Sequence, residues 1–152
     1  MPDDDVLSAC AKRTEIVQTY LASQPGETAR VRISGANGSY TCTHTVKTRI
    51  TAARRVEREH EISAAEYAAL LNTADPQKHV IRKKRYCLPY SGRVFEIDVF
   101  PFWQDRAIME IELCDEDETV VFPPQVHIFK EITADGRYTN AAMAVEVPYD
   151  EI

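Results

Sequence analysis

Charged side chains recur at every second position in five short stretches of the chain, which cover residues 30–33, 55–61, 83–86, 96–99 and 110–113. In four of the five, mainly apolar or aromatic residues fill the positions between the charges. Because successive side chains of a β-strand point to opposite faces, this period predicts strands with one charged face. A sheet curled around that face would enclose a charged lumen and turn its apolar side outward, to be covered by helices. In an ordinary sheet, the charged face would simply be the solvated one.

The hydrophobic pattern predicts about seven strands and two or three short helices, an α+β fold with an antiparallel sheet. Turns are expected at Pro25-Gly26, at residues 35–38 and at Ser91-Gly92. Ser63 and Glu66 form a capping box that begins a short helix through residue 71. The expected strands are residues 14–21, 29–34, 40–47, 54–62, 80–89, 93–100 and 107–113. Further helical segments are expected at residues 6–13 and 123–130, with a helical turn near 137–140.

Size and composition narrow the classes of protein. A chain of 152 residues with ordinary apolar and charged fractions predicts one domain with a full core. The net charge of −6 argues against a nucleic-acid partner. No run approaches the ~18 apolar residues of a membrane span, and the acidic start lacks a signal-peptide pattern, so we expect a cytoplasmic protein without a membrane partner. The four widely spaced cysteines predict reduced thiols rather than a zinc site or disulfides.

A basic set and an acidic set of residues occupy the predicted charged faces. The basic side chains could converge on phosphate oxygens, since Arg offers a planar fork and Lys a compact charge. The carboxylates could hold Mg²⁺ or Mn²⁺, which take oxygen ligands, or could pair with neighbouring cations. On spacing alone, a solvated strand face is the favoured interpretation. The basic set is Arg30, Arg32, Lys47, Arg55, Lys83 and Arg85, and the acidic set is Glu57, Glu59, Glu96, Asp98, Glu110 and Glu112.

The order of these segments resembles that of the CYTH domains, also called triphosphate tunnel metalloenzymes. Residues 30–32 look like the family's R-x-R strand, and residues 45–47 look like its T-x-K. Residues 55–59 are similar to its R-x-E-x-E, and residues 83–86 to its K-x-R-Y. Two late acidic strands, at 96–98 and 110–112, and a closing motif at 133–138 complete the order. These motifs in order favour a polyanion site, and the likeness is to short bacterial members that resemble inorganic triphosphatases.

The resemblance implies an antiparallel β tunnel that binds triphosphate or another polyphosphate and hydrolyses it with Mg²⁺ or Mn²⁺. It implies that the acidic set holds the metal, and that the basic set, together with Arg137 of the closing motif, binds the substrate. Lys47 and Lys83 would lie near the reacting phosphoryl group, where a lysine crowded by other cations could assist proton transfer. Two alternatives are a non-enzymatic polyphosphate-binding domain and another family activity, either thiamine-triphosphate hydrolysis or class IV adenylate cyclase activity.

One departure from the family pattern concerns the N-terminus. The family's first strand carries an E-x-E-x-K motif with two metal-binding carboxylates and a phosphate-binding lysine, whereas the residues before Thr14 include no glutamate. We therefore expect a single CYTH-like domain over residues 1–152 that is truncated at its N-terminus, with an incomplete metal site and weakened hydrolysis. A tunnel that lacks one strand exposes unpaired backbone groups along its edges, which favours a homodimer formed through an open edge.

Overall fold

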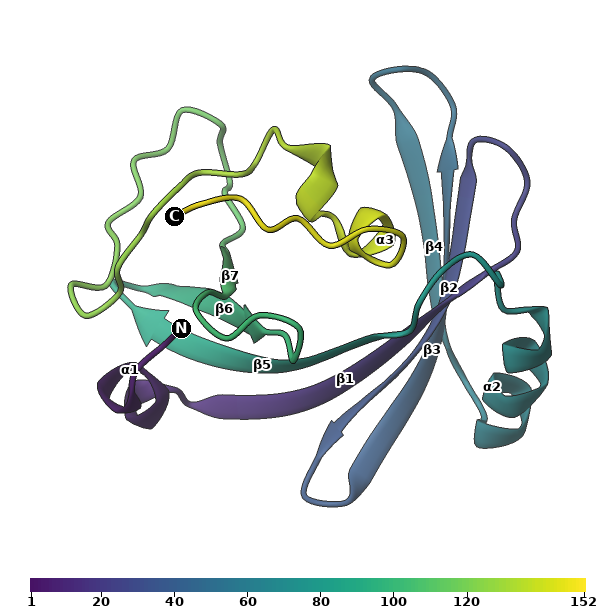
Figure 1. Ribbon diagram of the computed structural model, residues 1–152, viewed down its shortest axis with the longest axis horizontal. Helices are drawn as coiled ribbons and strands as arrows, with labels where there is room; N and C mark the ends of the chain where they lie inside the picture. The colour runs from purple at the N-terminus through teal and green to yellow at the C-terminus, as the bar shows by residue number, and fades with distance from the viewer. The chain divides into compact units, whose positions relative to one another are not determined.

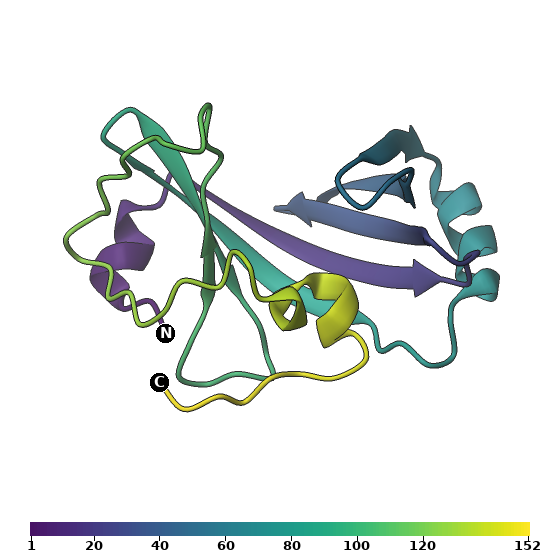
Figure 2. The ribbon, with the colours of Figure 1, turned by 90° about the horizontal axis from the view of Figure 1, so that it is seen from above.

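Seven strands lie in one sheet, in the order β4-β3-β2-β1-β5-β6-β7, in the computed structural model, which describes residues 1–152 (Figures 1 and 2). The pairs β2–β3, β3–β4, β5–β6 and β6–β7 are antiparallel. The predicted α+β class is confirmed. The strands are β1 Lys12–Leu21, β2 Glu27–Ala36, β3 Ser39–Arg49, β4 Arg55–Ile62, β5 Ile81–Tyr90, β6 Arg93–Val99 and β7 Ile108–Glu110. The α-helices are α1 Asp4–Ala9, α2 Ala64–Leu70 and α3 Asn140–Met143, and 3₁₀ turns cover Leu71–Thr73 and Gly136–Tyr138.

The chain divides into two compact units, each built from two segments that are separated in the sequence. Unit 1 consists of Met1–Glu15 and Arg82–Glu131. Unit 2 consists of Ile16–Ile81 and Ile132–Ile152. The expected single domain stays a prediction.

Two-residue turns close the hairpins β2–β3 and β5–β6. Asn37 and Gly38 have φ values of 55° and 79°, and Ser91 and Gly92 have φ values of 51° and 73°. Positive φ at both central residues is typical of the type I′ turn, whose twist matches that of the flanking strands. The first of these turns is therefore shorter than the predicted residues 35–38, because β2 continues to Ala36.

In unit 2, α2 covers the apolar face of strands β2 to β4 (Figures 1 and 2). Ser63 caps this helix as predicted, since its side chain accepts a hydrogen bond from the Glu66 amide at 3.1 Å. Tyr67 and Leu70 of α2 pack on buried apolar side chains of the sheet. Those side chains are Leu21, Ala29, Val31, Cys42 and Ile62. The residues that alternate with these along β2 and β3 point to the opposite face of the sheet, which carries the predicted charges.

In unit 1, α1 contributes Val6 to a core formed with the apolar face of β5 and β6. Val6, Leu88, Phe95 and Ile97 are all nearly or fully buried and pack together. Trp103 is 3% exposed, and its ring meets those of Phe100 and Phe102 edge-on. The opposite face of these strands carries the charged residues of unit 1.

Three predicted elements differ from the structure. Residues 123–130 form no helix. Pro123 is buried and Val126 packs on the core of unit 1, so tertiary packing holds this segment in an irregular conformation. The last strand covers only Ile108–Glu110, and the expected helix at 6–13 is α1, Asp4–Ala9. That helix begins earlier because the Asp3 carboxylate caps it, accepting from the Val6 amide at 3.0 Å.

Candidate active site

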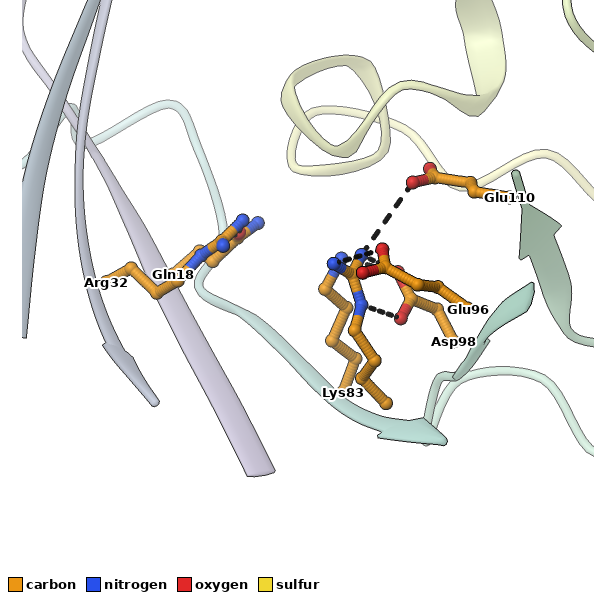
Figure 3. A network of polar contacts seen from close by, with 7 residues as sticks. Gln18, Arg32, Lys83, Glu96, Asp98 and Glu110 are labelled. Carbon is orange, nitrogen blue, oxygen red and sulfur yellow. Dashed lines mark hydrogen bonds and ion pairs between the residues drawn. The ribbon is translucent and has the colours of Figure 1, made fainter. Parts of the chain in front are cut away.

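Asp98 is the centre of a buried ion-pair network in unit 1 (Figure 3). Lys83 donates from Nζ to Oδ2 of Asp98 at 2.6 Å. Arg85 donates from Nε to Oδ1 at 2.7 Å and from Nη2 to Oδ2 at 2.8 Å. The antiparallel register explains the contact, because Arg85 of β5 and Asp98 of β6 are direct cross-strand partners. Asp98 is 1% exposed and Lys83 is 3% exposed, so both charges are removed from water.

The network fixes the ionisation of its members. Burial alone would raise the pKa of Asp98, but the hydrogen bonds from Arg85 and the charge and hydrogen bond of Lys83 hold that pKa below its ordinary value. Hydrogen bonding to Asp98 raises the pKa of Arg85 above its already high ordinary value, against the effect of burial. Asp98 is therefore a carboxylate with both oxygens engaged by cations. The ammonium of Lys83 also lies 5.7 Å from the centre of the Phe100 ring.

Glu96 and Glu110 lie beside Arg85 at the open side of this network. They are direct cross-strand partners on β6 and β7, which places two carboxylates opposite each other. The Arg85 guanidinium offsets their repulsion, with its Nη1 2.6 Å from Oε2 of Glu96 and its Nη2 3.7 Å from Oε2 of Glu110. Their side chains are 40% and 54% exposed, so both carboxylates can reach a ligand. Glu112 follows the end of β7 and is exposed.

In unit 2, Arg30 and Arg32 lie on the charged face of β2 next to polar residues of β1. The Gln18 side chain accepts from the guanidinium of Arg32 through Nε, at 2.7 Å, and through Nη2 (Figure 3). Burial raises the pKa of Tyr20, while the charge and hydrogen bond of Arg30 and the charge of Arg32 act in the opposite direction. Tyr20 and Gln18 are 3% and 0% exposed. The two arginines are thus held by side chains that belong to a neighbouring strand of the sheet.

Lys47, Glu57 and Glu59 lie on the same ladder of unit 2, on strands β3 and β4. Lys47 and Glu57 are direct cross-strand partners, with Nζ 3.6 Å from Oε2 and with both side chains about half exposed. Glu59 instead accepts from the hydroxyl of its partner Thr45 at 2.6 Å. Arg55 is exposed at the start of β4, opposite Arg49.

Arg137 is held by two carboxylates near the C-terminal end of unit 2. Its guanidinium contacts Asp135 through Nη2 at 2.6 Å and Asp150 through Nη1 and Nη2 at 2.9 and 2.8 Å. The Tyr138 hydroxyl donates to Asp150 as well, at 3.1 Å. These hydrogen bonds raise the pKa of Arg137. A phosphate could contact Arg137 only beside or in place of these carboxylates.

Comparison with known proteins gives relatives that match most of this chain. No family model matches the sequence. An inorganic triphosphatase from Acetivibrio thermocellus is 33% identical over 146 residues, which is 95% of this chain and 88% of that protein. The chain belongs to the CYTH, or triphosphate tunnel metalloenzyme, family. An inorganic triphosphatase from Nitrosomonas europaea is 32% identical over 97 residues, which is 62% of each protein.

Solved structures agree with the CYTH assignment. The crystal structure of the inorganic triphosphatase NE1496 superposes on this chain with a TM-score of 0.63 at 25% identity, over 91% of this chain and 86% of that one. The PH1819 protein from Pyrococcus horikoshii superposes with a TM-score of 0.51 at 21% identity, which bears on the fold alone. None of the helices of this CYTH chain is long and apolar enough to span a membrane.

The donor set of this CYTH chain fits a hydrated divalent cation better than a closed protein cage. No three His, Cys, Asp or Glu side chains are grouped so that they could hold a metal ion together. Mg²⁺, however, is usually bound by one or two carboxylates together with substrate phosphates and water. The facing, half-exposed carboxylates of Glu96 and Glu110 are such a pair. Asp98 does not have this freedom, since Lys83 and Arg85 engage both of its oxygens.

Three residues of these clusters were not among the candidates from the sequence. Gln18, Tyr20 and Thr45 are buried polar residues on the charged face. A signal was present, because Gln18 and Tyr20 alternate on β1 in phase with Arg30 and Arg32 on β2. Charge was the criterion for choosing candidates, and these three side chains are neutral. The roles of all the candidate residues as substrate, metal or catalytic groups stay predictions.

Proposed function

We propose that this CYTH protein hydrolyses inorganic triphosphate to diphosphate and phosphate. The observation that carries the proposal is the face of β2 and β3 in unit 2, where Arg30, Arg32 and Lys47 are gathered in a protein of net charge −6. Cations that cluster against the net charge of a protein favour an anionic ligand. Two relatives that match this chain are named inorganic triphosphatases, which supports triphosphate over the thiamine or adenine compounds considered from the sequence, and hydrolysis over binding alone.

The basic residues of each unit have different proposed roles. Arg30, Arg32, Lys47 and Arg55 of unit 2 bind phosphate oxygens, the arginines through bidentate hydrogen bonds. Arg85 of unit 1 binds phosphate through Nη1 and Nη2, the guanidinium nitrogens that face Glu96 and Glu110. These two carboxylates compete with the phosphate for the guanidinium. Arg137 contributes charge close to the substrate while it remains paired with its carboxylates.

The two lysines proposed to meet the reacting phosphoryl group differ in access. Lys47 is 43% exposed and its Nζ lies 3.6 Å from Glu57, so its ammonium can turn toward a phosphate. The side chain of Lys83 is 0% exposed and donates to Asp98. We propose that Lys47 touches the reacting group and that Lys83 holds Asp98, and through it Arg85, in place.

We propose a divalent cation, Mg²⁺ or Mn²⁺, at Glu96 and Glu110, with Glu112 close to the same end of β7. Such an ion neutralises charge on the phosphate and orients an attacking water when it is bound. The residues of the chain present two facing carboxyl groups, and the Arg85 guanidinium contacts both of them. Glu57 and Glu59 of unit 2 stay further candidates. The incomplete metal site, the cytoplasmic location and the homodimer also stay predictions. A second chain would pair at β4 or β7, which are the edge strands of the sheet.

The test is a phosphate-release assay with tripolyphosphate, in the presence of Mg²⁺, Mn²⁺ or a chelator. We expect release that depends on the metal and falls at least about tenfold in Lys47→Met, which removes a cation that contacts the reacting group. Lys84→Met is the matched control, because Lys84 is exposed and points to the opposite face of β5. Absence of release with both metals, or equal loss in the two variants, would contradict the proposal.

A further inference from the structure

Gln18 is a fully buried amide on β1, on the charged face of unit 2. Its Oε1 accepts from Nε and Nη2 of Arg32. A guanidinium can only donate hydrogen bonds, so this contact fixes which end of the amide faces Arg32. The other end, Nε2, carries two hydrogens, is buried and has no hydrogen-bond acceptor.

A second buried donor without an acceptor lies on the neighbouring strand. Nε of Arg30 is buried and has no hydrogen-bond partner. Buried polar groups in folded proteins nearly always have a partner, so each exception calls for an explanation. Three buried side-chain atoms lack a partner, and one of them, Oδ1 of Asn140, is an acceptor at the start of α3. The other two are the N–H donors of Gln18 and Arg30, on strands that are adjacent in the sheet and beside the positive charges of Arg30 and Arg32. The shared need is for an oxygen acceptor with negative charge, which is what a phosphate group offers.

We propose that Gln18 binds a phosphate oxygen of the substrate through Nε2 while it positions Arg32 through Oε1. The inference rests on the proposed function, and it adds an uncharged residue to the substrate-binding set. Gln18 holds the Arg32 guanidinium in one orientation and adds its own amide N–H groups to the phosphate-binding donors of Arg30 and Arg32. Tyr20 and Thr45, which are also buried on this face, keep water away from the donors.

The isosteric variant Gln18→Glu separates the two roles. A glutamate keeps an oxygen for Arg32, so the contact that positions Arg32 is retained in the protein without ligand. The substitution Gln18→Glu also removes both Nε2 hydrogens and places a negative charge where the phosphate would bind. A residue with a purely structural role would tolerate this change, whereas a residue that contacts the phosphate would not.

Calorimetric titration with tripolyphosphate in chelator, combined with thermal unfolding of the ligand-free protein, tests the inference. We expect Gln18→Glu to bind tripolyphosphate about tenfold to hundredfold more weakly than the unaltered protein, the range for a hydrogen bond to a charged group. Its Tm without ligand should be unchanged or higher. Gln77→Glu is the matched control, since it makes the same change of net charge at an exposed position of unit 2.

Each other result has a definite meaning. Equal affinities in Gln18→Glu and Gln77→Glu would overturn the contact between Gln18 and phosphate, as would weak binding accompanied by a large fall in Tm. If Gln18→Glu does not fold, Gln18→Met replaces it, with at least a tenfold loss of affinity expected and unchanged affinity overturning the inference. Absence of binding by the unaltered protein would overturn the proposed function itself, and this inference with it.

Discussion

Replacing Asp98 by Asn is the sharpest test of the ion-pair network in unit 1. The side chain keeps its shape but loses its charge, and the Lys83 ammonium remains in a site where its side chain is 0% exposed. Removal of one partner from a buried ion pair leaves an uncompensated charge, which destabilises a protein by about 3–5 kcal/mol. Since the whole free energy of unfolding of a domain is about 5–15 kcal/mol, we expect Asp98→Asn to lose a large fraction of its stability.

Two companion variants make this reasoning specific. Lys83→Met should be milder than Asp98→Asn, because Asp98 retains two hydrogen bonds from Arg85. The double variant Lys83→Met/Asp98→Asn should be more stable than Asp98→Asn alone, since the buried ammonium that has lost the Asp98 carboxylate is then removed. An increase in stability upon adding a second substitution is the signature of a desolvated charge, and simple loss of contacts would not produce it.

The assay is urea unfolding followed by circular dichroism at neutral pH. Glu110→Gln is the control, because its carboxylate is 54% exposed and 3.7 Å from Arg85, and surface pairs of this kind contribute about 0–1 kcal/mol. A loss of less than about 1 kcal/mol in Asp98→Asn, or a double variant that is less stable than Asp98→Asn, would refute the account of Lys83 and Asp98 as a pair removed from water.

Three further predictions concern pH and packing. The pKa of Asp98 is lowered in the folded protein, so the ionised side chain stabilises the fold above the unfolded-state pKa of about 4. This stabilisation is lost as the pH falls through the folded-state pKa. The difference in unfolding free energy between the unaltered protein and Asp98→Asn should therefore narrow below about pH 4 in urea titrations. Gly35→Ala should destabilise the protein by about 3 kcal/mol, since the new Cβ would lie 2.0 Å from the backbone oxygen of Ser39. Gly38→Ala should destabilise it by about 1–2 kcal/mol, because of its positive φ alone. Thermal unfolding measures both losses. Val6→Ala should lose about 2 kcal/mol in the same assay, because Val6 is 2% exposed in the core of unit 1, and an unchanged Tm would show that α1 does not contribute to that core.

Local sequence signals predicted the fold where they act over a few residues. The capping box at Ser63 and the turns at Asn37-Gly38 and Ser91-Gly92 each specify their own geometry, and the structure confirms the elements they delimit. The segment after Pro123 shows the limit of such signals. A helix was predicted to begin at Pro123-Pro124, but Val126 packs on the core of unit 1, and tertiary packing of this kind has no local period to reveal it.

The candidate site was predictable in its charges and less so in its pairings. The alternation identified Lys83, Arg85 and Asp98 as side chains of one charged face, and the register brings them together. Their burial could not be predicted, because the same alternation occurs in strands whose charged face is solvent-exposed and in strands whose charged face is buried. Gln18 was missed because candidates were chosen by charge and its side chain is neutral. Its alternation with Tyr20 on β1 was visible, but the hydrogen bond that gives it a role joins it to Arg32 on another strand.

The division of unit 1 into two distant segments has a consequence for synthesis on the ribosome. Val6 leaves the ribosome long before Leu88, Phe95 and Ile97, the residues that bury it, have been made. At about 5–20 residues per second, the wait is roughly 4 to 16 seconds. The hairpin β2–β3 closes over two residues and folds in about 1–10 μs once it has emerged. A nascent chain of this protein therefore exposes the apolar face of α1 throughout the time in which the middle of the sheet takes shape.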